Sequence, residues 1–112
     1  MLDITTQELR RCDVVRGKGR IDSATVNDLK SAFETITEAG RFKIVFNMAD
    51  VAFMSSAGLR QMIETMKVCK RFNRGDLILA EVPQSMKDVL ELAGLTPIFK
   101  IYDTEVEAVG SF

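Results

Sequence analysis

The amino-acid sequence predicts an α/β fold with a mixed, mostly parallel sheet of four to five strands and four helices. Short apolar runs alternate along the chain with longer segments in which apolar residues recur every three or four positions. Such alternation is typical of parallel strands joined by helical crossovers. The first two predicted strands are separated by only a short turn, so the N-terminal strand is expected to be an antiparallel edge strand.

Composition narrows the classes of function. The chain has 112 residues, so residues 1–112 are expected to form a single domain. Its 15 basic and 16 acidic side chains nearly cancel, which argues against direct binding of nucleic acid or of an anionic membrane. The sequence contains no histidine, which is the commonest general base and zinc ligand. We therefore expect a binding protein without a cofactor or metal, rather than an enzyme.

The N-terminal part is expected to contain two strands and a helix. Strands are predicted at residues 3–8 and 12–16, and the glycines in 17–19 predict a flexible break after them. A helix then follows Asp22 or Ser23 as its N-cap. The apolar residues of this helix fall on one face and are Val26, Leu29, Phe33 and Ile36. Gly40 stands where a glycine commonly ends a helix.

The rest of the chain is expected to alternate between strands and helices. Strands are predicted at 42–46, 76–80 and 98–102, and helices at 56–72, between Pro83 and Gly94, and at 104–109. Residues 47–54 are expected to form a loop, and residues 73–75 to end the preceding helix. In the last helix, Val106 and Val109 are expected to point inward.

Cysteine usage and hydropathy bear on where the protein works. Cys12 and Cys69 are too few for the disulfide framework of a small secreted domain, and we expect both to be reduced and buried. The N-terminus lacks the apolar run of a signal peptide, and no apolar segment reaches the ~18–20 residues that a membrane span needs. The sequence therefore predicts a cytoplasmic protein.

Two adjacent serines precede the predicted helix at 56–72. In open α/β sheets, binding sites gather beyond the carboxyl ends of the strands. The first amides of a helix have no partner within the helix, and its dipole favours an anion there. One interpretation is that Ser55 only caps the helix. The other is phosphorylation, because a phosphate of about −1.5 to −2 charges suits a helix start.

The segment VAFMSSAGLR, residues 51–60, resembles the signature of the STAS domain family, which includes the bacterial anti-sigma-factor antagonists. The segment GKGRIDSAT is similar to the entry into the first helix of that family. The segment PQSMKDVLELAGLTPIFKIYDTEVEAV is similar to its C-terminal half. The resemblance extends from about residue 9 to residue 109, and it implies a single STAS-like domain.

In that family the central motif typically reads Asp-Ser-Ser/Thr-Gly, and a partner kinase phosphorylates the first serine. With Gly58 aligned to the motif, the resemblance implies that Ser56 is the phosphorylated residue. This chain departs from the pattern, because Ser55 replaces the Asp and Ala57 replaces the second hydroxyl residue. Ser55 is therefore an alternative phosphorylation site.

The surroundings of Ser56 are expected to bind the partner. The expected contact residues are Asp22, Met48, Asp50, Met54, Ser55, Ser56, Gly58 and Arg60. Asp22 matches an acidic residue of the family, although capping the first helix would also explain it. Met48 or Met54 is expected to be exposed as an adaptable apolar contact, whereas Phe53 is expected in the core. Arg60 either pairs with a phosphate or an acidic partner, or is simply solvated.

The resemblance implies a regulatory switch. The unphosphorylated protein would bind an anti-sigma factor with serine kinase activity and so release a sigma factor for transcription. Phosphorylation of Ser56 would block binding, and a serine phosphatase would restore it. We expect a monomer or a weak dimer. The alternatives are a constitutive STAS scaffold in a signalling or membrane-transport assembly, which Ser55 in place of Asp favours, and a small hydrolase, which has little support.

Overall fold

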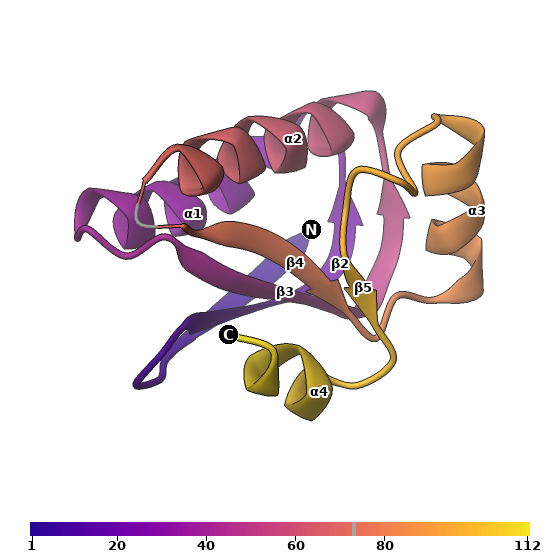
Figure 1. The fold of residues 1–112 in the computed structure, drawn as a ribbon. Helices are drawn as coiled ribbons and strands as arrows, with labels where there is room; N and C mark the ends of the chain where they lie inside the picture. Colours follow the sequence, from indigo (N-terminus) through magenta and orange to yellow (C-terminus); the bar gives the residue numbers. More distant parts are fainter. Residues whose placement is uncertain (73) are drawn as a thin grey trace.

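The computed structural model describes residues 1–72 and 74–112, and this part of the chain forms one five-stranded sheet with four helices (Figure 1). In chain order the elements are β1 (Leu2–Glu8), β2 (Asp13–Ile21), α1 (Val26–Glu38), β3 (Lys43–Met54), α2 (Ser56–Arg71), β4 (Asp76–Ala80), α3 (Gln84–Leu92), β5 (Ile101–Tyr102) and α4 (Glu105–Gly110). The strand order is β1-β2-β3-β4-β5, with β1 antiparallel to β2 and the other neighbours parallel. The predicted fold class is confirmed. Within the helix end expected at 73–75, residue 73 lies outside the described residues.

The sheet separates two apolar clusters of unequal size. Helices α1 and α2 cover one face, and the larger cluster there includes Phe33, Phe46 and Met62 (Figure 1). On the opposite face, the short helix α4 covers a smaller cluster that includes Val45 and Ala108. Phe46 and Val45 are adjacent residues of β3, and both are fully buried. This part of β3 is therefore covered on both faces, as central parallel strands are.

Both cysteines are buried and free, as expected. Burial raises the pKa of the Cys69 thiol to about 12, and burial followed by the charge of Asp13 raises the pKa of Cys12. Neither thiol is therefore a ready nucleophile. No helix in the described part of the chain is both long enough and apolar enough to cross a membrane.

Strands β2 and β3 are longer than their sequences suggest. Residues 17–19 are not a flexible break, and residues 47–54 are not a loop, because the two segments pair with each other. Lys18 lies opposite Asp50 and Ile21 lies opposite Met54, with register shifts on either side of the Lys18–Gly19 step. Gly19 has φ +114°, and a Cβ there would lie 2.3 Å from the Met1 carbonyl oxygen. The glycines thus allow a bent strand rather than ending it.

The start of α1 also differs from the expectation. The N-cap is Thr25, not Asp22 or Ser23, and the helix begins at Val26. The Asp22 carboxylate instead accepts hydrogen bonds from the amides of Ala24 at 3.0 Å and Thr25 at 3.2 Å. Asp22 therefore stabilises a turn between β2 and α1, which is the usual role of an Asp that bonds its own following backbone.

Helix α1 ends where the sequence predicts, just before Gly40. Gly40 has φ +81°, and the amide of Arg41 donates to the carbonyl of Ile36 at 3.2 Å. This six-residue closure is the Schellman motif, in which glycine adopts the left-handed conformation without a steric penalty.

The C-terminal elements are shorter than predicted or differently oriented. The strand expected at 98–102 is limited to Ile101–Tyr102. In α4, Val106 is 82% exposed, so the expectation that it points inward is wrong. Ala108 is buried in its place, and Val109 packs against the same small cluster as expected. One six-residue helix has a single narrow inner face, and α4 fills that face with Ala108.

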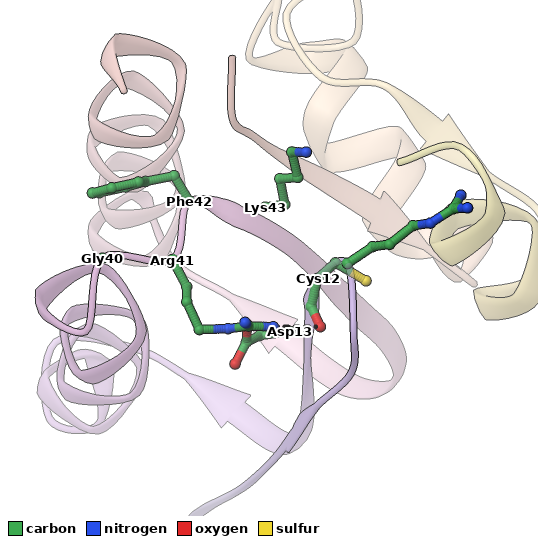
Figure 2. Close-up of a pocket in the computed structure, with 7 residues that line it drawn as sticks. Cys12, Asp13, Gly40, Arg41, Phe42 and Lys43 are labelled. Atoms are coloured by element: carbon green, nitrogen blue, oxygen red, sulfur yellow. Dashed lines mark hydrogen bonds and ion pairs between the residues drawn. The ribbon is translucent and has the colours of Figure 1, made fainter. Parts of the chain in front are cut away.

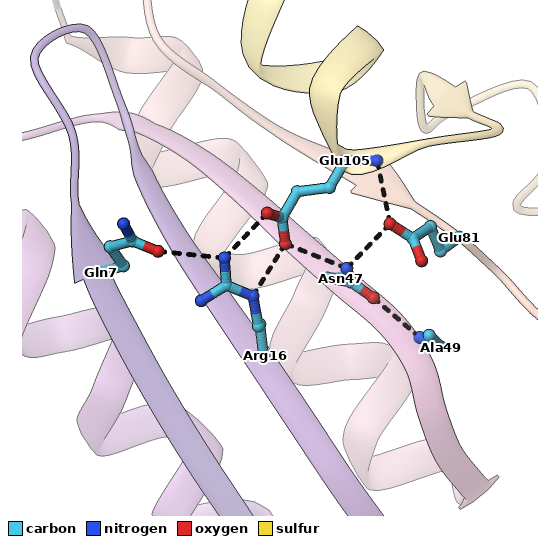
Figure 3. A network of polar contacts seen from close by, with 6 residues as sticks. All are labelled: Gln7, Arg16, Asn47, Ala49, Glu81 and Glu105. Atoms are coloured by element: carbon cyan, nitrogen blue, oxygen red, sulfur yellow. Dashed lines mark hydrogen bonds and ion pairs between the residues drawn. The ribbon is translucent and has the colours of Figure 1, made fainter.

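A polar network attaches α4 to the sheet (Figure 3). The Arg16 guanidinium donates two hydrogen bonds of 2.8 Å to the Glu105 carboxylate. Asn47 donates to Glu105 at 3.0 Å and to Glu81 at 3.2 Å, and the Glu105 amide donates to Glu81 at 3.0 Å. Hydrogen bonds from Arg16, followed by those from Asn47, outweigh burial and lower the pKa of Glu105.

Removing this carboxylate is expected to change the response of stability to acid. Folding lowers the pKa of Glu105, so the ionised carboxylate stabilises the folded state. This contribution to the free energy of unfolding is fully present at pH values above the ordinary carboxyl pKa, and it is lost as the pH falls through the folded pKa. Glu105→Gln should lower the free energy of unfolding by about 1 kcal/mol at neutral pH. The two proteins should converge only below the folded pKa of Glu105, which lies under the ordinary carboxyl range. Urea unfolding at several pH values measures the difference, and Glu91→Gln, at an exposed residue of α3, is the control.

Candidate functional site

The two serines lie where the ends of β2 and β3 meet the start of α2. Ser55 follows Met54, the last residue of β3, in extended conformation (φ −81°, ψ 173°), and α2 begins at Ser56. The Ser55 amide donates to the Ile21 carbonyl at 2.8 Å, and the Ser55 carbonyl accepts from the Leu59 amide at 3.1 Å. The backbone of Ser55 thus connects α2 to the end of β2 and holds the helix start in place.

The two hydroxyl groups differ in accessibility. Ser56 is exposed, whereas the Oγ of Ser55 is buried and has no hydrogen-bond partner. Ser55 occupies the N-cap position of α2, but its side chain makes no capping hydrogen bond. Ser56 is therefore accessible on the folded protein, whereas the Ser55 hydroxyl becomes accessible only after a change in conformation.

Gly58 packs against the core. A Cβ at this position would lie 2.7 Å from Ile21 Cγ2 and 2.8 Å from Met54 Cγ, closer than real Cβ contacts. A glycine is therefore needed for α2 to approach the ends of β2 and β3. The structure thus gives Gly58 a packing role at the helix start, and its buried position leaves little surface for a partner.

The apolar residues before Ser56 are arranged differently from the expectation. Met48 is 1% exposed and Met54 is 4% exposed, so the expectation that one of them is exposed is wrong. Phe53, which was expected in the core, is 37% exposed, and the Arg20 guanidinium lies 4.3 Å from its ring centroid. The shifted register of β2 and β3 turns Met54 inward and Phe53 outward. The three-residue spacing of Met48, Val51 and Met54, all buried, is the signal in the sequence for this irregular strand.

Three of the expected contact residues, Asp22, Asp50 and Arg60, are charged. Arg60 lies one turn along α2 from Ser56 and is exposed, and Asp50 is exposed on β3. Partial desolvation of Asp22 raises its pKa, but hydrogen bonds from Ala24 and Thr25 and the charge of Arg20 lower it overall. Asp22 thus remains a carboxylate. We call the exposed residues Arg20, Phe53, Ser56 and Arg60 the Ser56 surface.

Three clefts in the described part of the chain lie elsewhere, and none of these three is lined by Ser55 or Ser56. Among the described residues, no three His, Cys, Asp or Glu side chains are placed to hold a metal ion. A surface with an aromatic residue, cations and a reachable hydroxyl is suited to contact with another protein.

Comparison with known proteins identifies the family. The pattern of the STAS domain matches residues 3–108. The chain is 26% identical over 109 residues to the anti-sigma F factor antagonist of Paenibacillus polymyxa, covering 96% of this chain and 92% of the relative. It is 27% identical over 107 residues to the anti-sigma-B factor antagonist of Staphylococcus aureus, covering 95% and 96%. These relatives are regulatory binding proteins and not enzymes.

Solved structures show the same fold. The anti-sigma factor antagonist SpoIIAA in its unphosphorylated form superposes with a TM-score of 0.81 at 23% identity, covering 96% of this chain and 93% of SpoIIAA. The Bacillus SpoIIAA in its phosphorylated form superposes with a TM-score of 0.75 at 23% identity, covering 97% and 98%. The matched pattern extends over nearly all strands and helices described above, from β1 to α4, and this chain therefore belongs to the STAS domain family.

Proposed function

We propose that this protein is an anti-sigma-factor antagonist whose Ser56 surface binds an anti-sigma factor with serine kinase activity. Binding sequesters the anti-sigma factor and releases a sigma factor for transcription. Phosphorylation of Ser56 by the same kinase ends the interaction, and a serine phosphatase restores it. The observation that carries the proposal is the exposed Ser56 hydroxyl at the start of α2, next to the buried Ser55 hydroxyl.

The position of Ser56 suits a switch that acts through charge. The first amides of α2 are free of helical partners, and the first turn of α2 contains no acidic residue. A phosphate at Ser56 would therefore be tolerated by the folded domain, since the helix dipole favours an anion there. The added charge changes the surface that the partner meets. The names of the relatives and the phosphorylated form of SpoIIAA support this proposal.

One observation favours a second function. Ser55 stands where the family typically has an aspartate, so the carboxylate beside the phosphorylated serine is missing. A STAS domain that is never phosphorylated would act as a constitutive scaffold in a signalling or membrane-transport assembly. In that case Ser56 would be a surface residue of the scaffold.

Phosphorylation in vitro separates the two functions. Incubation with the cognate kinase and ATP is expected to add one phosphate, which peptide mass spectrometry places on Ser56. Ser56→Ala should abolish the modification. Ser55→Ala should remain a substrate and keep its stability, because the Ser55 hydroxyl makes no hydrogen bond that the substitution would remove. A phosphate on Ser55 would contradict the assignment to Ser56, and no phosphate with an active kinase would favour the scaffold.

A further inference from the structure

We propose that a cleft at the opposite end of the sheet from Ser56 binds a small anion that carries two linked phosphate groups. The cleft has a volume of about 430 Å³ and includes four cationic side chains, Lys43, Lys70, Arg74 and Lys100. Lys43 is the first residue of β3, whereas Ser56 lies two residues beyond the last residue of that strand. The two sites are therefore separated by the length of β3, and the proposal does not depend on phosphorylation of Ser56.

The four cations come from separate segments that the fold brings together. Lys43 begins β3, Lys70 lies in the last turn of α2, Arg74 precedes β4, and Lys100 precedes β5. The register of β3 with β4 places Lys43 opposite Asp76, and the Lys100 carbonyl accepts a hydrogen bond of 2.9 Å from the Leu79 amide.

Gly75, the residue immediately before β4, lies close to the residue that precedes β3. A Cβ at Gly75 would lie 2.1 Å from the carbonyl oxygen of Phe42. The neighbouring Arg74 is thus held near the first residue of β3, Lys43, and both line the cleft. A side chain at this position would prevent the close approach of the two backbones, so glycine is required for this arrangement.

The positive charge of this cleft is only partly offset by its own lining. One lining side chain, Asp76, is acidic, and it is 9% exposed. The ion pairs found among the described residues are Arg16–Glu105 and Arg41–Asp13, and neither involves a cation of this cleft. The side chains of the cleft therefore carry an excess of three positive charges, which a bound anion would offset.

A neighbouring cleft provides the contrast. It has a volume of about 200 Å³, is lined by Asp13 and Arg41, and shares Lys43 with the proposed site (Figure 2). There the Arg41 guanidinium pairs with the Asp13 carboxylate and donates to the carbonyls of Leu9 at 2.6 Å and Cys12 at 3.3 Å. Figure 2 shows the Lys43 amino group directed away from this pair. Arg41 is therefore neutralised and hydrogen-bonded within the protein, whereas the Lys43 side chain can contribute to the larger cleft.

The chemistry of the cleft matches linked phosphates. Lysine ammonium groups bind phosphate oxygens as point charges, and arginine adds a directional donor. The dipole of α2 accounts for a cation in its last turn such as Lys70, but it does not account for Lys43 and Lys100 at the starts of strands. A single phosphate carries about −1.5 to −2 charges, less than the excess of three in the cleft, so we assign two phosphates.

Titration with inorganic pyrophosphate tests the proposal. Isotope-labelled protein is titrated at low ionic strength and again at about 0.15 M salt, with the amide resonances and the heat of binding recorded. We expect saturable binding with a Kd below about 1 mM, in the range of a weak but specific ligand. The largest shifts should occur at Lys43, Arg74 to Asp76 and Lys100. Inorganic phosphate should bind at least threefold more weakly.

Charge-matched variants test the position. Lys70→Glu/Lys100→Glu is expected to weaken pyrophosphate binding at least tenfold. Lys30→Glu/Lys67→Glu changes two exposed lysines outside the cleft by the same charge, and it should weaken binding less than threefold. Circular dichroism and Tm measurements verify that both variants fold. Lys70→Gln/Lys100→Gln, which removes the two charges without reversing them, should also weaken pyrophosphate binding more than the control variant does.

Several outcomes would overturn the site. These are the absence of saturation, an equal loss of affinity in both double variants, and shifts confined to Arg11 and Arg41. Vesicles of phosphatidylcholine with phosphatidylserine provide a further arm. One outcome is that the protein sediments with these vesicles and loses that association in Lys70→Glu/Lys100→Glu, while pyrophosphate does not bind. In that case the cleft contacts a membrane, and the small-anion proposal is wrong.

Discussion

Ser56→Asp is expected to weaken binding of the anti-sigma factor by about 10- to 1,000-fold. Two unit charges about 4 Å apart interact by roughly 4 kcal/mol at an effective dielectric constant near 20, and each 1.4 kcal/mol is about tenfold in affinity. One acidic group of the partner facing Ser56 is enough for an effect of this size. Isothermal titration of the purified partner measures the change in Kd.

The stability of the Ser56→Asp variant should stay within about 1 kcal/mol of the original, because an acidic residue in the first turn of a helix interacts favourably with its dipole. Ser56→Asn introduces a side chain of nearly the same shape as aspartate but without its charge, and it should bind the partner within threefold of the original protein. Ser31→Asp places the same charge on an exposed position of α1 and should also leave binding unchanged. Full affinity in Ser56→Asp would exclude the charge switch at this residue.

Gly58→Ala is expected to destabilise the domain by about 1–3 kcal/mol, the usual cost of forcing an extra carbon into a packed core. The new Cβ would lie 2.7 Å from Ile21 Cγ2, on a β-branched side chain with little rotational freedom, and 2.8 Å from Met54 Cγ. The start of α2 must move away from the sheet, so binding through Ser56 should weaken as well. Thermal and urea unfolding measure the first effect, with a fall in Tm of roughly 4 °C for each kcal/mol.

Gly110→Ala is the matched control. A Cβ at Gly110 meets no atom within 4 Å, and its φ lies outside the left-handed region. This substitution should be neutral or slightly stabilising, because alanine reduces the conformational freedom of the unfolded chain. If Gly58→Ala were equally neutral, the close contact between α2 and the ends of β2 and β3 would be wrong.

The helices and central strands could be predicted because their signals are local. The apolar stripe of Leu29, Phe33 and Ile36 defines the buried face of α1, and Gly40 adopts the left-handed conformation that ends this helix. The run DLILA forms β4 at the expected residues. Each of these features depends on periodicity or backbone preference within one segment, so the sequence of that segment is sufficient.

The candidate site was predictable in position but not in detail. The sequence places Ser55 and Ser56 at the start of a helix, as the structure confirms, but it predicts a loop rather than a strand before them. The opposite exposure of the two hydroxyls depends on how the start of α2 packs against Ile21 and Met54. Phe53 is exposed and Met54 is buried, the reverse of the prediction, because the pairing of β2 with β3 is shifted. The three-residue spacing of Met48, Val51 and Met54 is consistent with this pairing, but the pairing itself depends on β2, which lies outside residues 47–54.

The sequence alone therefore determined the order of the elements, the fold class and the serine pair, because local preferences and the resemblance to the STAS family carry that information. The tertiary structure alone decided which surfaces result. Pairing of residues 18–21 with residues 50–54 made one continuous sheet from a predicted break and a predicted loop. Convergence of Lys43, Lys70, Arg74 and Lys100 placed four cations in one cleft of a chain whose charges nearly cancel. Contacts between residues far apart in the chain are set by packing, which a reading of one segment at a time does not contain.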